Sequence, residues 1–101
     1  MSRRADPHAG LLRHLQARLT GAGLEAQLQS SHSQRWSSAT FTGARHRFHF
    51  AASGREEAIA QVARQLSESD LPLPDHIVAD IALFRSDGAG FDVEALTVEA
   101  R

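Results

Sequence analysis

Hydrophobic and polar side chains alternate most regularly at residues 45–50. Phe48 and Phe50 fall on one side of this run together with His46. The other side carries the basic side chains Arg45, Arg47 and His49. Successive side chains of a β-strand point to opposite faces of a sheet. The run therefore predicts a strand with an apolar face toward the core and a cationic face toward solvent.

Two stretches carry hydrophobic residues at helical spacing. The first is a leucine stripe made by Leu11, Leu12, Leu15 and Leu19. Asp6 and Pro7 precede it, and this pair favours a helix start because Asp accepts from free N–H groups and Pro lacks the N–H that would need a partner. The second stripe consists of Ile59, Val62, Ala63 and Leu66. The sequence predicts helices over residues 7–21 and 54–68.

A period of two predicts three strands between these helices, over residues 24–31, 36–42 and 45–50. In the middle strand we expect Ala39 and Phe41 to face inward and Trp36 to face outward. The polar residues 30–34 are expected to connect the first two strands. Residues 43–44 are expected to form a tight turn into the third.

A second hairpin is predicted from strands at residues 77–84 and 91–98 around a Gly- and Asp-rich turn. The first of these strands has an expected inner face of Ile77, Ala79, Ile81 and Leu83. In the second strand, Leu96 and Val98 are out of phase with Phe91 and Val93 unless a bulge intervenes.

These elements predict a single α+β domain spanning residues 1–101, with residues 1–6 disordered or extended. The expected architecture is an antiparallel sheet of about five strands with two helices packed on one face, in the order α-β-β-β-α-β-β. This arrangement is the simplest way to bury all the apolar stripes.

The predicted helix–three strands–helix order of residues 7–68 resembles the topology of the double-stranded-RNA-binding domain. That family holds phosphates with a basic cluster at the start of its second helix. Here the corresponding residues are Arg55, Glu56 and Glu57, and the two carboxylates would repel a phosphate backbone. The final hairpin has no counterpart in that family, so no family is assigned.

Composition narrows the classes of function. The chain has no cysteine, which excludes disulfides, thiolate nucleophiles and Cys-based zinc sites. It shows no membrane-length apolar run and no secretory leader, so a cytoplasmic protein is expected. The net charge of −1 conceals an asymmetry: residues 1–55 carry eight arginines and two carboxylates, whereas residues 56–101 carry three arginines and ten carboxylates. Such a split favours a basic binding surface or two mutually attracting ends.

One candidate site is the outward face of the first three predicted strands. Its anion-binding candidates are Trp36, Arg45, Arg47 and His49. Arg forks bind phosphate or carboxylate and Trp offers a stacking plane, so the ligand would be an anion or single-stranded nucleic acid. The alternative is an ordinary sheet face that simply shows polar residues to water.

Catalysis, metal binding and cofactor binding have little support. There is no P-loop, dinucleotide or nucleophile-elbow motif, and we predict no cofactor. His46 and His49 face opposite sides of one strand, which is wrong for one metal ion, and His46 is expected to be partly buried and bonded to backbone. An acid–base pair of His49 with Asp80 or Glu94 is the one enzymatic alternative.

Self-association has the best support. The final hairpin carries surplus apolar residues, which give the predicted dimer interface of Val78, Phe84, Leu96 and Val98. Monomers rarely leave such patches exposed. Their neighbours are acidic, so a two-fold dimer could set one acidic hairpin against the partner's cationic strand. The alternative is that the segment 71–74 covers them within one chain. The sequence thus predicts a non-catalytic, homodimeric interaction or regulatory module.

Overall fold

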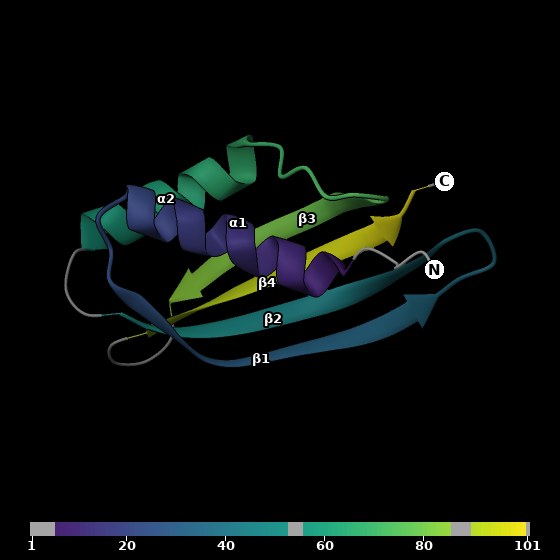
Figure 1. Ribbon diagram of the computed structural model, residues 1–101, viewed down its shortest axis with the longest axis horizontal. Coiled ribbons are helices and arrows are strands. Elements are labelled where there is room, and N and C mark those ends of the chain that lie inside the picture. The colour runs from purple at the N-terminus through teal and green to yellow at the C-terminus, as the bar shows by residue number, and fades with distance from the viewer. Residues whose placement is uncertain (1–5, 53–55, 86–89, 101) are drawn as a thin grey trace, which may run out of the picture.

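The computed structural model describes residues 6–52, 56–85 and 90–100. Its elements in chain order are α1 (Pro7–Gly21), β1 (Ala26–Ser37), β2 (Thr42–Ala52), α2 (Glu56–Glu68), β3 (His76–Arg85) and β4 (Gly90–Glu99). The strands form one antiparallel sheet in the order β1-β2-β4-β3. Both helices lie on the same face of this sheet (Figure 1). The α+β class is confirmed.

The expected number of about five strands is wrong, because the sheet has four. Residues 30–34, expected as a connection, belong to the single long strand β1. The expected strand over 36–42 is instead the end of β1 and a turn. In that turn, the Ser38 N–H donates to the Phe41 carbonyl at 2.7 Å and the Phe41 N–H donates to the Ser38 hydroxyl at 3.1 Å. Phe41 is 58% exposed rather than inward.

The length of the β1–β2 hairpin explains why its sequence was misleading. A strand of 12 residues spans about 40 Å, whereas a helix of 15 residues spans about 22 Å. The hairpin therefore extends beyond the helices (Figure 1). Most of the second half of β1 has no helix to pack against, and it is exposed and polar. With only two strands between α1 and α2, the topology also departs from that of the double-stranded-RNA-binding domain.

The two helices form where their sequence patterns predict. The Asp6 carboxylate caps α1 by accepting from the N–H groups of His8 at 3.0 Å and Ala9 at 3.3 Å. The chain leaves this helix through Gly23, whose φ of 76° favours glycine. Of residues 1–6, predicted to be disordered or extended, Asp6 has an extended backbone. Residues 1–5 and the first residues of the predicted second helix lie outside the described residues. None of the helices in the described parts of the chain is long and apolar enough to cross a membrane.

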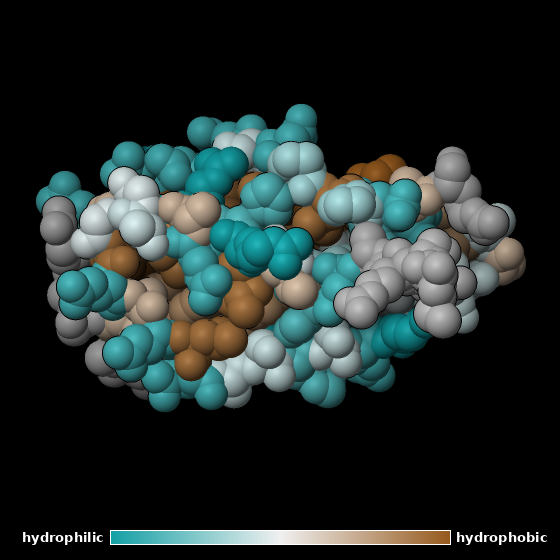
Figure 2. All heavy atoms as spheres, in the orientation of Figure 1, coloured by the Kyte–Doolittle hydropathy of each residue, from teal (hydrophilic) through white to brown (hydrophobic). Residues whose placement is uncertain are grey.

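The core lies between the helices and the sheet. The buried leucines of α1 and the leucine, isoleucine and valine of α2 form one buried cluster with three phenylalanines of the sheet, Phe48, Phe50 and Phe91. The rings of Phe50 and Phe91 stack across β2 and β4 with centroids 5.4 Å apart. Seen from the helix side, the surface is mostly hydrophilic, with hydrophobic side chains showing between the helices and the sheet (Figure 2). The prediction that Phe48 and Phe50 face inward is confirmed.

Bulges set which side chains of the edge strands face the helices. The register of β3 against β4 shifts between Val78 and Asp80. As a result Ile77 is 57% exposed, although it was expected to face inward, while Ile81 packs against the core as expected. Strand β4 needs no bulge: Phe91, Val93, Ala95 and Thr97 are buried in strict alternation.

Candidate functional site: the open face of the sheet

The face of the sheet opposite the helices, here called the open face, presents four rows of side chains. The strand register places one residue of each strand in each row. In the order β1, β2, β4, β3, the end row is Trp36, Gly43, Val98 and Ile77. The second row is Gln34, Arg45, Leu96 and Asp80. The third row is His32, Arg47, Glu94 and Ala82. The fourth row is Ser30, His49, Asp92 and Phe84.

The end row is apolar and tightly packed around Gly43. A Cβ atom on Gly43 would lie 2.9 Å from Cζ2 of Trp36, so the indole covers this position. The Trp36 Nε1 atom is buried, and it has no hydrogen-bond partner among the described residues. Ile77, at the other end of the row, is largely exposed. The end row is therefore a hydrophobic strip across the full width of the sheet.

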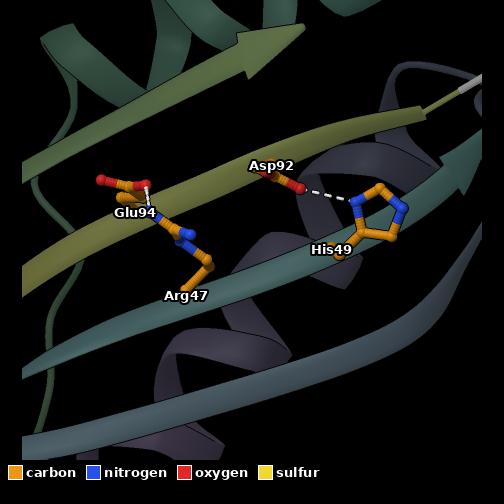
Figure 3. A network of polar contacts seen from close by, with 4 residues as sticks. All are labelled: Arg47, His49, Asp92 and Glu94. Atoms are coloured by element: carbon orange, nitrogen blue, oxygen red, sulfur yellow. Dashed lines mark hydrogen bonds and ion pairs between the residues drawn. The ribbon is translucent and has the colours of Figure 1, made fainter. Parts of the chain in front are cut away.

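Two cross-strand side-chain contacts connect β2 to β4 on the open face (Figure 3). Arg47 pairs with Glu94, its cross-strand neighbour. Nδ1 of His49 lies 2.5 Å from a carboxylate oxygen of Asp92, which is directly opposite it. The Arg47–Glu94 pair neutralises part of the positive charge that the sequence placed on β2. Exposed pairs of this kind contribute little to folding stability.

The second row is different, because its two charges lie two strands apart. Arg45 is on β2 and Asp80 is on β3, with Leu96 of β4 between them. In the described parts of the chain neither residue has an ion-pair partner. A hollow of about 380 Å³ opens here, and Arg45, Asp80 and Leu96 line it together with Phe84.

The structure brings all four predicted anion-binding residues, Trp36, Arg45, Arg47 and His49, to the open face. However, Arg47 and His49 already have carboxylate partners. A phosphate would have to displace those carboxylates. Arg45 is the member of this set that has no such partner in the described chain.

The predicted dimer residues divide between the two faces. Phe84, Leu96 and Val98 lie on the open face, where Phe84 is 50% exposed. Val78 lies on the helix side and packs against the core. The bulge after Val78 accounts for this difference, because it reverses the phase of β3.

The enzymatic alternative placed His49 beside Asp80 or Glu94. The structure instead pairs it with Asp92, and Glu94 pairs with Arg47. The hollow on the open face is lined by neither His49 nor Asp92. His49 therefore has a carboxylate that can orient it, and neither residue lines this hollow.

A second polar cluster, which the sequence did not reveal, lies on the helix side. His46 is 3% exposed, and its ring nitrogens contact side chains rather than the expected backbone. Its Nδ1 lies 3.0 Å from Nδ1 of His8, and its Nε2 lies 2.9 Å from Oγ1 of Thr97. These contacts border a cavity of about 370 Å³. Within the described residues, no group of three or more metal-binding side chains is found.

Comparisons with protein-family models, curated proteins and solved structures find no match to this chain.

Proposed function

We propose that this chain is a non-catalytic interaction module that forms a homodimer through the open face of its sheet. The observation that carries the proposal is the second row. Arg45 and Asp80 lie in one row, lack ion-pair partners in the described chain and border a common hollow. A second copy can supply both missing partners at once, because a two-fold axis makes every contact twice.

The charge layout selects the direction of the two-fold axis. An axis perpendicular to the strands would place β2 over the partner's β2, and Arg47 would approach a like charge. An axis parallel to the strands places β2 over the partner's β4 and β1 over the partner's β3. Arg45 then faces the partner's Leu96, one strand away from the partner's Asp80. Opposite charges approach in this arrangement and like charges separate.

The same axis brings the end rows together. Trp36 lies over the partner's Ile77, and Gly43 lies over the partner's Val98. Four strands at about 4.8 Å and four rows at about 6.8 Å give roughly 500 Å² of flat area per protomer. The total of about 1,000 Å² reaches the lower limit for a specific interface. The dimer is therefore expected to be reversible.

The proposed interface would bury exposed hydrophobic side chains at both ends of the open face. In the single chain, Ile77 in the end row is 57% exposed and Phe84 in the fourth row is 50% exposed. Burial of apolar area stabilises association by about 25 cal/mol per Å² before the costs of docking. The proposed cellular role is that of a regulatory module in the cytoplasm. A chain without cysteine fits such a reducing compartment because it needs no disulfide.

Sedimentation equilibrium at micromolar concentration tests this proposal. The expected mass is about 22 kDa, twice the 11.0 kDa of one chain. Val98→Glu places a charge in the end row and is expected to give the monomer. Gln61→Glu adds the same charge on the exposed side of α2 and should leave the dimer intact. A wild-type mass of 11 kDa, or equal effects of the two changes, would exclude the open face as the interface.

A further inference from the structure

The contact between His8 and His46 joins the first turn of α1 to the middle of β2. Their Nδ1 atoms are 3.0 Å apart, although the residues are separated by 38 positions in the chain. The His8 ring also stacks on Phe48, with centroids 4.5 Å apart and planes 16° apart. This pair is a side-chain link between the start of the helix and the sheet.

One arrangement of protons satisfies all of these contacts. The Thr97 hydroxyl can donate to the Ala44 carbonyl at 3.4 Å, and its oxygen then accepts from His46 Nε2–H at 2.9 Å. A neutral His46 that carries its proton on Nε2 has a lone pair on Nδ1. His8 must then donate its own Nδ1 proton to that lone pair. The link exists only while at least one of the two rings is neutral, because a hydrogen bond between the two Nδ1 atoms needs one lone pair.

We propose that the contact between His8 and His46 is an acid-released link that holds the first turn of α1 against the sheet. When both rings are protonated, two N–H groups face each other across the contact. A buried cation without an acceptor is unstable. The first turn of α1 then separates from β2, which uncovers Phe48 and gives His46 access to water.

The charged groups around the His8–His46 contact determine at which pH the two rings are protonated. The pKa of His46 is lowered to about 4, chiefly by burial and also by His8 and His76, while Asp6 acts to raise it. The pKa of His8 is also lowered, again chiefly by burial, with Asp6 raising it and His32 lowering it. From β1 and β4, Arg35 and Glu99 line the adjoining cavity and face each other at 3.6 Å, and Asp75 lines it from the segment before β3.

Hydrogen exchange of the first-turn amides measures the release. An opened turn lets His46 titrate near its ordinary pKa of 6.5, whereas the closed turn holds that pKa at about 4. Linkage then predicts that the population of the open turn rises about 70-fold between pH 7.5 and 4.5. The Gly10 N–H, which donates to the Asp6 carbonyl at 3.0 Å, is a direct reporter.

Three variants separate the link from other acid effects. His46→Phe cannot ionise, so its first turn should show little of this increase. Asp6→Asn keeps a side-chain oxygen that can cap the helix but removes the carboxylate, and its first turn should still open in acid, at a lower pH because Asp6 raises the pKa of both histidines. His14→Gln is the control, because His14 Nε2 contacts the Pro72 carbonyl at 2.7 Å and can donate in both protonation states. An undiminished increase in His46→Phe, or its loss in Asp6→Asn, would overturn the proposal.

A titration of the wild type followed by nitrogen chemical shifts gives a second test that needs no variant. His46 should be neutral with Nδ1 unprotonated at pH 7, and protonation of both His8 and His46 should coincide with loss of first-turn protection. Protonation of both rings with the first turn still protected would also overturn the proposal. Neither test depends on the dimer, since a monomer contains the same contact.

Discussion

The indole of Trp36 covers Gly43 on the neighbouring strand, and this leaves no room for a side chain at position 43. A Cβ atom there would lie 2.9 Å from Trp36 Cζ2 and only 2.0 Å from the Thr97 carbonyl oxygen. The second atom belongs to the backbone and cannot rotate away. The end row of the open face therefore depends on glycine at its second position.

We expect Gly43→Ala to lower the free energy of unfolding by at least about 2 kcal/mol, as overpacking of a tight site does. Gly21→Ala is the matched control, because a Cβ at position 21 meets nothing within 4 Å. Alanine at that helical position should be neutral or stabilise by up to about 1 kcal/mol. Urea unfolding of both variants measures the difference. Equal stabilities would show that the backbone at Gly43 has space that the structure does not contain.

The alternation that predicted β2 has a direct energetic consequence. Phe48 is fully buried, whereas the Arg47 side chain is 62% exposed. Phe48→Ala should cost roughly 3–5 kcal/mol because it opens a cavity in the core. Arg47→Ala should cost less than about 1 kcal/mol, since it removes only an exposed ion pair. Denaturant melts of the two variants should differ accordingly, and similar costs would contradict the assignment of faces.

The stability of the fold should decrease in mild acid because of His46. Its pKa is about 4 in the folded chain, against 6.5 for an ordinary histidine. Between these values the unfolded chain binds a proton that the folded chain does not, so the free energy of unfolding falls as the pH falls. His46 should account for a loss of about 2 kcal/mol between pH 7 and pH 5.

His46→Phe removes that contribution while keeping a ring in the core. Urea midpoints at pH 7 and pH 5 measure it as the difference in pH dependence between variant and wild type. Should both proteins lose the same stability on acidification, His46 would not be the group responsible.

Local alternation predicted the parts of the fold where helices cover the sheet. Phe48 and Phe50 lie under the helices, so their strand carries a clear period of two, and both helices carry clear apolar stripes. The pattern failed at the far end of β1, where residues 30–34 look like a connection. A strand that extends past its helices has no apolar face to bury and shows no hydrophobic period.

The candidate site was predicted in part. Arg45, Arg47, His49 and Trp36 were expected to share a face, and they do. Their carboxylate partners depend on the order of β2 beside β4, which no local pattern contains. The His8–His46 contact was missed for the same reason, because a separation of 38 residues is a property of the tertiary fold.

The second row gives the most direct test of the dimer, because charge reversal there breaks no ion pair found within the described chain. Arg45→Glu and Asp80→Arg should each place like charges together in the proposed dimer, and each variant alone should sediment as an 11.0 kDa monomer. An equimolar mixture restores both opposite-charge contacts. We predict that the mixture sediments at about 22 kDa, twice the mass of the single chain. A mixture that stays monomeric, or single variants that remain dimers, would contradict the account.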